Sequence, residues 1–309
     1  MDGQEVILLK DVLDTFFSED ILKEMFNEKL YREVLCDYWK YSMFVIFWIG
    51  CNIGSFLNVC IYRLPLGMSL CRPKSHCPKC GHKLSWYENI PIFSYLFLLA
   101  ACKDCGQRIS PRYIIVEFIT GVLFAAVYLK IVFCKLPLTS MLLFFYLFSV
   151  LLSAAFTDCD LRVIPNKLTI PAMVVIPAYF LLHNGIYPFQ PDWKSFSICL
   201  ANMAGTALVM SAFTIGGKKI FKRDVFGWGD VKYLVVTAGA LGWFATLLIL
   251  LFASVTAMIY MPIYWIFRPK RKKRGFPFAP FMTVYAFGWI LFNQYAIPFI
   301  KKIMNCYPG

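Results

Sequence analysis

The stretch FGWGDVKYLVVTAGALGWFATLLILLF, residues 226–252, places one carboxylate, Asp230, at the mouth of a long apolar run. The 22 residues that follow this aspartate contain a single charge, Lys232. A helix of about 20 apolar residues is long enough to cross the hydrocarbon core of a bilayer. The stretch therefore predicts a membrane fold, and an acid at such a position is a candidate for function because ionisable groups are costly there.

The composition extends this prediction to the whole chain. Of its 309 residues 59% are hydrophobic and 16% are charged, whereas a soluble domain has about half and about a quarter. We expect an all-α polytopic membrane protein with about eight transmembrane helices and a small cytoplasmic zinc-binding loop domain. The predicted spans are 41–60, 113–133, 137–156, 168–184, 195–215, 231–249, 250–267 and 278–300. The turn between the sixth and seventh spans is expected at Gly242, Trp243 or a nearby position.

The net charge of +13 is explained by membrane topology. With eight crossings, the alternate loops 63–112, 157–167, 216–232 and 268–274 hold 8, 2, 5 and 6 lysine and arginine residues, which is 21 of the chain's 31. Basic loops stay on the cytoplasmic side. We therefore expect these four loops in the cytoplasm and membrane lipid, not nucleic acid, beside the basic run RKKR at 271–274.

Four regions are expected along the chain. Residues 1–40 hold 10 of the 18 acids and show helical apolar spacing, which predicts an acidic amphipathic N-terminal extension, expected on the outer side of the membrane. Residues 41–60 form the first transmembrane helix, 61–112 a cytoplasmic zinc-knuckle domain, and 113–309 a membrane domain. The role of the extension stays open.

Two CxxC pairs, CPKC at 77–80 and CKDC at 102–105, lie in the first long loop, and each is followed by glycine, Gly81 or Gly106. Four thiolates from two such knuckles make a closed tetrahedral site, which suits structural Zn²⁺. Disulfides or free thiols are the alternative, disfavoured on the reducing side of the membrane. The expected ligands are Cys77, Cys80, Cys102 and Cys105, with neighbouring His76 and His82 as bystanders.

A second group of acids lies in FTDCDLRVIPN, residues 156–166, directly after the third predicted span. The end of the third span and the start of the sixth face the same side, so Asp158 or Asp160 is expected at the depth of Asp230. Two neighbouring carboxylates can share one proton and act as general acid and general base. Alternatively, Asp230 is a helix cap, and the spacing leaves Asp160 as a competitor of Asp158.

Three features of the sequence together resemble the type IV prepilin peptidase family (prepilin leader peptidase/N-methyltransferase). They are GxGD before a span, an aspartate seven residues ahead of the proline of IPN, and a loop with two CxxC pairs. The resemblance covers all but the first forty residues. It is carried by GSFLNVCIYRLP (54–65), SHCPKCGHKLSWYENIPIFSYLFL (75–98), ISPRYIIVE (109–117), IPN (164–166) and GWGDVK (227–232).

The resemblance implies an aspartic endopeptidase of the bacterial cytoplasmic membrane. It would cut the short basic leader of type IV prepilins and pseudopilins after a glycine at the cytoplasmic face, with Asp158 and Asp230 as the catalytic pair. The expected neighbourhood of that pair is Gly227, Gly229, Lys232, Pro165 and Asn166, where the two glycines would let an extended leader approach the backbone.

The resemblance also implies methylation of the new N-terminus from S-adenosylmethionine, with Asn58, Arg63 and Glu117 as candidate residues. One departure weakens this expectation. The family usually has Arg-Gly where this chain has Leu99 and Ala100, and alanine is expected to close off a backbone position with positive φ.

Two other functions compete with this interpretation. One is a GxGD protease that cleaves within other transmembrane substrates, for which the zinc loop has no evident use. The other is a transporter that couples to protons or cations through paired aspartates, which fits poorly with acids at the ends of spans.

Overall fold

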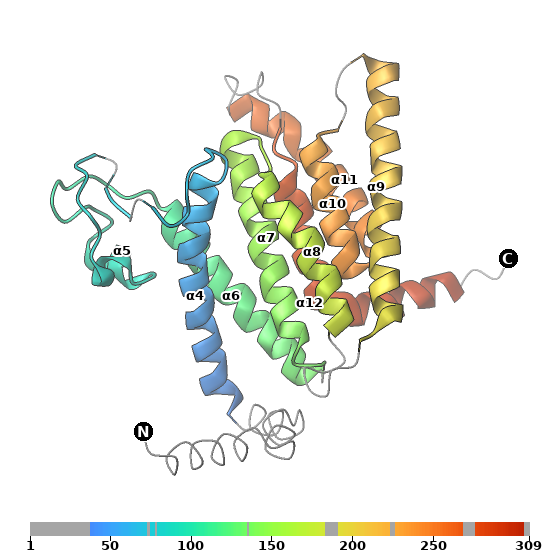
Figure 1. Cartoon of the computed structure of the whole chain (residues 1–309), viewed down its shortest axis with the longest axis horizontal. Helices are drawn as coiled ribbons and strands as arrows, with labels where there is room; N and C mark the ends of the chain where they lie inside the picture. The colour runs from blue at the N-terminus through green and yellow to red at the C-terminus, as the bar shows by residue number, and fades with distance from the viewer. Residues whose placement is uncertain are drawn as a thin grey trace, which may run out of the picture.

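The computed structural model describes residues 38–72, 75–77, 79–134, 136–182, 191–222, 226–267 and 276–305, with side chains of the last helix described up to residue 293. The expected extension up to residue 37 and the basic run 271–274 lie outside these residues. The described part is helical and contains no strand, only two isolated β-bridges. In chain order the helices are α4 (Trp39–Arg63), η1 (Trp86–Asn89), α5 (Phe93–Phe97), α6 (Arg112–Phe133), α7 (Ser140–Leu161), α8 (Asn166–Leu182), α9 (Trp193–Phe221), α10 (Trp228–Leu241), α11 (Trp243–Phe267) and α12 (Ala279–Asn305) (Figure 1).

The expectation of an all-helical membrane fold is confirmed. Seven of the eight predicted spans each overlap one helix, and the span predicted at 231–249 overlaps the short helix α10 and the start of α11. Five of these helices, α4, α6, α7, α9 and α11, are long and apolar enough to cross a membrane. The predicted boundary between 231–249 and 250–267 is wrong, because α10 ends at Leu241. The turn itself was expected at Gly242, Trp243 or a nearby position, and this is confirmed: Gly242 makes the turn with a φ of 86°, a conformation that glycine adopts readily.

Helix α10 is too short to be a span of its own. Its 14 residues reach about 21 Å at 1.5 Å per residue. It lies inside the bundle, in contact with α7, α8, α9, α11 and α12, and Val231 and residues 233–239 are all buried. Protein rather than lipid therefore surrounds most of it, and its N-terminal acid is held inside the bundle.

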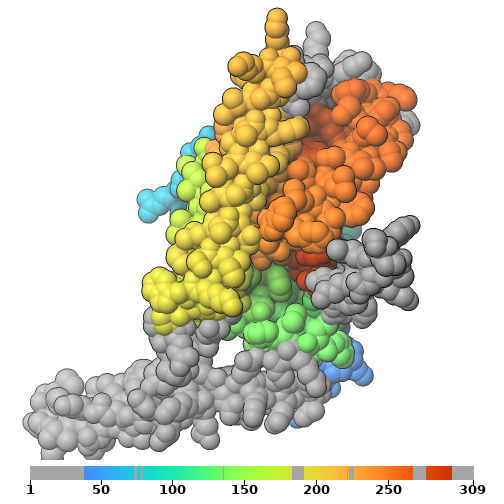
Figure 2. All heavy atoms as spheres, turned by 90° about the vertical axis from the view of Figure 1, so that its right-hand side faces the viewer, coloured from blue at the N-terminus to red at the C-terminus, as the bar shows by residue number. Residues whose placement is uncertain are grey.

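Hydrogen bonds between hydroxyl groups fix α10 against its neighbours. Tyr233 and Thr283 of α12 share a hydrogen bond of 2.7 Å between their hydroxyls, and Thr283 also donates to the carbonyl oxygen of Leu151 in α7 at 3.2 Å. Helices α9 and α11 lie side by side on one outer face of the molecule (Figure 2). The core that positions α10 is thus formed by α7, α8 and α12 as well as by these two outer helices.

Helices α4 and α6 pack closely because glycines line their contact. Gly50 and Gly54 form a GxxxG pattern in α4, and Gly121 lies on the facing side of α6. A Cβ atom on Gly54 would lie 2.7 Å from the Cα of Glu117, and one on Gly121 would lie 2.6 Å from the Sγ of Cys51. Small residues allow helix backbones to approach in this way in membranes, so the α4–α6 pair is a rigid base for the loop between them.

Candidate functional site

The loop between α4 and α6 contains two knuckles built by the same local hydrogen bonds. In the first, Cys77 accepts from the N–H of Gly81 at 2.9 Å, and in the second Cys102 accepts from the N–H of Gly106 at 2.9 Å. Both glycines have positive φ, 75° and 66°, which costs glycine little. Each CxxCG sequence therefore folds locally into a turn that directs its two thiols to one side.

The two knuckles face each other and bring four thiols together. The Sγ atoms of Cys77, Cys80, Cys102 and Cys105 all lie within 4.8 Å of one another. Across the knuckles, Cys77 is 3.8 Å from Cys105 and Cys80 is 3.9 Å from Cys102. Tetrahedral Zn–S bonds of about 2.3 Å would separate the sulfurs by about 3.8 Å. The cluster can thus hold a metal ion and contains no disulfide.

The backbone of the first knuckle also favours a metal-binding thiolate. Hydrogen bonds from the backbone of Cys80 and then of Lys79 lower the pKa of Cys77 to about 6. Metals bind the thiolate and not the thiol. The donor set, with the electrostatics at Cys77, therefore fits a divalent metal with a preference for sulfur.

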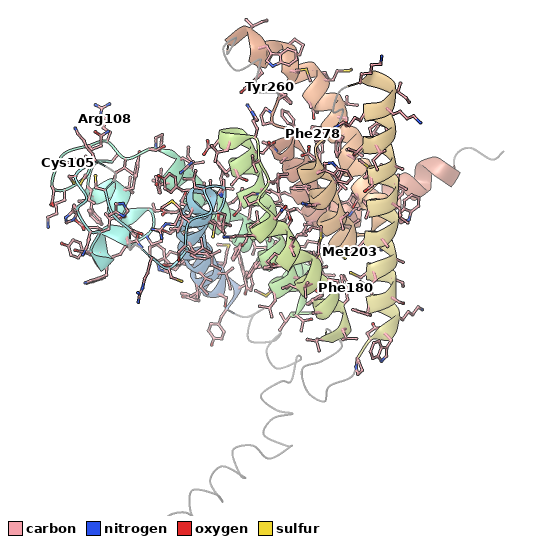
Figure 3. All side chains as sticks on the ribbon, turned by 45° about the horizontal axis from the view of Figure 1, so that its top comes forward. Cys105, Arg108, Phe180, Met203, Tyr260 and Phe278 are labelled. Atoms are coloured by element: carbon pink, nitrogen blue, oxygen red, sulfur yellow. The ribbon has the colours of Figure 1, made fainter. Side chains whose placement is uncertain are left out.

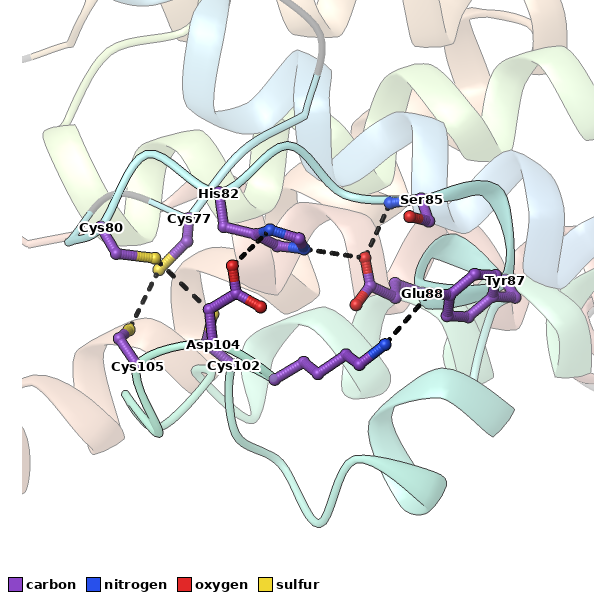
Figure 4. A network of polar contacts seen from close by, with 10 residues as sticks. Cys77, Cys80, His82, Ser85, Tyr87, Glu88, Cys102, Asp104 and Cys105 are labelled. Carbon is purple, nitrogen blue, oxygen red and sulfur yellow. Dashed lines mark hydrogen bonds and ion pairs between the residues drawn. The ribbon is translucent and has the colours of Figure 1, made fainter.

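His82 joins the two knuckles without being one of the four sulfur ligands (Figure 4). Its Nδ1 lies 2.7 Å from Oδ2 of Asp104 in the second knuckle, and its Nε2 lies 3.1 Å from Oε2 of Glu88 in η1. Both ring nitrogens of His82 thus face carboxylate oxygens. The sequence analysis did not identify this bridge.

Glu88 is the buried end of that bridge. The N–H of Ser85 donates to its carboxylate at 2.7 Å, and this hydrogen bond, followed by that from His82, lowers the pKa of Glu88 below its usual value. The sequence SWYE at 85–88 is a capping box, S-x-x-E, and could have indicated this contact.

The peptidase-like motifs lie at one end of the helix bundle. Asp158 belongs to the last turn of α7, not to the loop after it, and is 8% exposed. Its Oδ2 accepts the N–H of Ala279, the first residue of α12, at 3.0 Å. Asp230 is the third residue of α10, and its carboxylate accepts a hydrogen bond from the backbone of Gly227. The carboxylates of Asp158 and Asp230 are close enough to interact electrostatically.

Asp160 is directed elsewhere. It is exposed and forms an ion pair with Arg112 at the start of α6. The sequence left Asp160 as a competitor of Asp158, but Asp160 pairs with Arg112, whereas Asp158 is close enough to Asp230 to interact with it electrostatically. The ion pair instead ties the end of α7 to α6.

The other residues expected near the aspartates hold the first turns of α8 and α10 together. Lys232 donates from Nζ to Oδ1 of Asn166 at 2.7 Å, and Pro165 is buried directly before α8. A Cβ atom on Gly229 would lie 3.2 Å from the Cβ of Ile164. A larger residue at position 229 would therefore press against Ile164, so close packing favours glycine there. At Gly227 a Cβ would lie 3.0 Å from Oδ2 of Asp230.

Arg162 is a neighbour of Asp158 that the sequence analysis missed. It ends α7 with a φ of 62°, and its guanidinium donates to the carbonyl oxygen of Asp158 at 3.1 Å and to the hydroxyl of Tyr264 at 2.7 Å. The arginine places a positive charge beside the aspartates and links α7 to α11.

The residues expected to serve methyl transfer lie where the loop meets α4 and α6. The buried Glu117 accepts the N–H of Ile92 at 2.8 Å. Asn58 donates to the carbonyl oxygen of Tyr113 at 3.1 Å, while its buried Oδ1 has no hydrogen-bond partner among the described residues. Arg63 is engaged in the turn after α4, where it donates to the carbonyl oxygens of residues 69 and 70.

Leu99 and Ala100 both have positive φ, 49° and 58°. The expectation that alanine would close off this backbone conformation is therefore wrong. Hydrogen bonds hold the turn: the N–H of Ala100 donates to the carbonyl oxygen of Tyr95 at 2.8 Å, and its own carbonyl accepts the N–H of Ile109 at 2.6 Å. These hydrogen bonds hold the turn although Leu99 and Ala100 carry side chains that disfavour positive φ.

The sulfur cluster and the aspartates occupy different parts of the molecule. Figure 3 shows Cys105 in the loop on the far side of α4 from Phe278, which directly precedes the α12 residue bonded to Asp158. The chain thus has two separate polar centres, one made of thiols and one of carboxylates.

Comparison with known proteins matches two parts of the chain to protein families. Residues 48–131 match the model of the bacterial peptidase A24 N-terminal domain, and residues 145–261 match the type IV leader peptidase family. No solved structure matches the chain.

Several curated relatives are called prepilin leader peptidase/N-methyltransferase. One from Klebsiella pneumoniae is 36% identical over 69% of this chain and 90% of its own length. One from Neisseria gonorrhoeae is 31% identical over 79% and 88%. One from Myxococcus xanthus is 40% identical over 69% of this chain, and the match spans 60% of that relative. The identities, the coverage and the two matched domains show that the chain belongs to the prepilin leader peptidase/N-methyltransferase family.

Proposed function

We propose that this protein is a membrane aspartic endopeptidase that removes the leader of type IV prepilins and pseudopilins. The observation that carries the proposal is the carboxylate pair of Asp158 and Asp230 at one end of the bundle. Two carboxylates that share one proton can carry out peptide hydrolysis without a nucleophilic side chain.

In the proposed reaction, the ionised carboxylate takes a proton from a water molecule, whose oxygen attacks the scissile carbonyl carbon. The protonated carboxylate donates its proton to the carbonyl oxygen. When the C–N bond breaks, the leaving nitrogen takes the proton that the first carboxylate had removed from water and becomes the new amino terminus, while a hydroxyl of the tetrahedral intermediate returns its proton to the second carboxylate as the new carboxyl group forms. One water is consumed and the pair returns to its starting state.

The neighbours of Asp158 favour negative charge on that member of the pair. It receives the N–H of Ala279 at the N-terminus of α12, where the helix dipole also stabilises an anion. The guanidinium of Arg162 is a second source of positive potential. We therefore propose Asp158 as the base and Asp230 as the acid that protonates the carbonyl oxygen. Lys232 and Asn166, bonded to each other, would keep the two helix starts in register.

We further propose that this end of the bundle faces the cytoplasm. Arg63, Arg112 and Arg162 all lie at the ends of helices on this side, and basic residues are retained on the cytoplasmic side. A prepilin anchored by its own apolar helix would then present its basic leader at the depth of the aspartates.

Methylation of the new N-terminus is the second activity that we propose. S-adenosylmethionine would supply the methyl group, and Glu117 and Asn58 would hold it. The carboxylate and the unpartnered buried Oδ1 of Asn58 are acceptors suited to an ammonium or hydroxyl group. Arg63 would support the loop, and structural Zn²⁺ on the four thiolates would give the small loop its folding free energy.

Co-expression with a prepilin, followed by mass spectrometry of the mature product, tests both activities. Cleavage after the leader glycine supports the peptidase, and an added mass of about 14 Da, one methylene, reports methylation. An uncleaved prepilin in the presence of correctly inserted protein contradicts the proposed peptidase. A cleaved product without the added mass contradicts only methyl transfer.

A further inference from the structure

The loop that carries the thiols also contains an apolar stretch that neither proposed activity explains. Residues 90–101, IPIFSYLFLLAA, contain no charged side chain. Apolar stretches of about 10–14 residues are too short to span a bilayer and are typical of buried, interfacial or re-entrant segments. The short helix α5 lies within this stretch.

Two contacts fix the depth of the stretch. The ring of Phe93 lies 5.3 Å from the ring of Trp48 in α4. Trp48 precedes the end of α4 at Arg63 by 15 residues, which corresponds to about 22 Å along the helix. The N–H of Ile92 also donates to Glu117, inside α6. Helix α5 therefore lies beside α4 and not beyond its end (Figure 1).

Several side chains of this stretch are open to the surroundings, including the part of Phe93 that does not face Trp48. Phe97 is 81% exposed and Leu99 is 87% exposed, and Leu96 and Phe93 are also exposed. A contiguous apolar surface of this kind is unusual against water and marks contact with a membrane or a partner. We call these four residues the apolar face of the loop.

Most N–H groups of the stretch satisfy the requirement that hydrocarbon imposes. Unpaired N–H groups are costly at membrane depth, so non-helical backbone is tolerated there only when protein satisfies it. The N–H of Ile92, which precedes α5 and has no helical partner, is taken by the Glu117 carboxylate. The N–H groups of the following residues donate to carbonyl oxygens within the stretch; these are Phe93, Ser94, Leu96, Leu98, Leu99, Ala100 and Ala101.

The borders of the stretch have the composition of a membrane interface. Trp86 and Tyr87 precede it and are both exposed, and Lys103 follows it, with Nζ 5.5 Å from the Tyr87 ring centre. Trp and Tyr are enriched at the level of the lipid headgroups. Aromatic and basic residues thus stand where the segment would enter and leave the leaflet.

We propose that residues 90–101 form a re-entrant segment that inserts into the leaflet on the Arg63 side of the membrane, with its apolar face against lipid acyl chains. We propose lipid as the partner of the apolar face for three reasons: α5 lies beside α4, most of the N–H groups are paired within the protein, and aromatic residues border the segment, as expected for a segment in a bilayer. This insertion fixes the knuckles at the membrane surface, and it does not depend on the proposed catalysis.

Photo-crosslinking in lipid vesicles tests the insertion. The full chain would carry benzoylphenylalanine at Phe97 or, in a second variant, at Leu99, in vesicles of phosphatidylethanolamine and phosphatidylglycerol. The same probe at Phe118 of α6, 53% exposed, is the membrane control, and at Leu66, 54% exposed in the turn after α4, the solvent control. Retained zinc identifies correctly folded variants.

We expect phospholipid adducts from positions 97 and 99 at the yield of position 118 and several-fold above that of position 66. Yields equal to those of position 66 would overturn the proposal. Adducts mainly to a second copy of the chain, or to a prepilin added to the vesicles, would also overturn it, because they would identify the face as a protein-binding surface.

Discussion

The carboxylate pair and the thiol cluster are positioned in opposite ways. Asp158 and Asp230 are 72 residues apart in the sequence, and they meet only because α7, α10 and α12 pack together. Each pair of thiols, by contrast, is placed by hydrogen bonds inside its own five-residue knuckle. The carboxylate site therefore depends on the whole bundle, while the thiol site depends on local turns and on a metal.

Because of this difference, we expect the largest loss of leader cleavage from substitutions of the two carboxylates. Asp158→Asn and Asp230→Asn keep the size of the side chain but remove its ability to exchange a proton. General acid–base groups contribute about 10²–10⁴-fold to rate, so leader cleavage should fall by about that factor in either variant. Immunoblots of a co-expressed prepilin would measure the loss.

Asp160→Asn is the matched control for these variants. It lies in the same turn but pairs with Arg112, so most of the cleavage should remain. Full activity of Asp230→Asn would contradict the aspartic mechanism. Equal losses in all three variants would instead indicate damage to the end of α7.

Substitutions in the thiol cluster should abolish metal binding and methylation but leave leader cleavage nearly unchanged. Cys77→Ser with Cys80→Ser removes two of four ligands, and we expect the purified protein to lose its zinc, about one ion per chain in the parent. Methylation of the product should disappear, while cleavage should stay within a few-fold of the parent because the loop lies apart from the aspartates. Elemental analysis and product mass spectrometry measure the two outcomes.

Cys71→Ser controls for general thiol loss, since Cys71 is exposed and is not one of the four clustered thiols. Loss of cleavage together with zinc would show that the two regions are not independent and that the loop supports the bundle.

A smaller effect is expected from the bridge between the knuckles. His82→Ala removes the contacts to Asp104 and Glu88 but leaves all four thiols in place. We expect zinc to be released several-fold faster to a chelator, with cleavage unchanged. Asp104→Asn, which removes one side of the bridge, should have an intermediate effect. Release rates equal to the parent in both variants would show that the bridge does not stabilise the metal site.

Much of both sites could be predicted from the sequence for reasons that the structure explains. The order of the apolar runs placed Asp158 and Asp230 on one side, and the spacing of the CxxC pairs predicted the four-thiol cluster, because spans and knuckles are both marked by local pattern. The contact between the two aspartates itself depends on packing of the bundle. Arg162 and the N-terminus of α12 were not predicted, since their contacts with Asp158 depend on packing between distant helices. The end of α10 was misplaced because residues 233–252 contain no charge to mark it.

The turn at Leu99 and Ala100 shows where a local rule failed. Tertiary hydrogen bonds, including that from Ile109 to the carbonyl oxygen of Ala100, hold both residues at positive φ. For residues other than glycine this conformation costs about 1–2 kcal/mol each. The loop therefore carries strain that a glycine would relieve.

Ala100→Gly should accordingly stabilise the loop by about 1 kcal/mol, part of the relieved strain being offset by the greater freedom of glycine in the unfolded chain. The midpoint of zinc release in denaturant would measure the shift. Ala101→Gly is the matched control, because Ala101 does not have positive φ and glycine there should lower the midpoint. A lower midpoint in both variants would show that the turn is not strained at Ala100. A higher midpoint for Ala100→Gly together with a lower one for Ala101→Gly would locate the strain at Ala100. The stability of the loop would then be limited by the single methyl group of that residue, whereas the bundle depends on packing between helices.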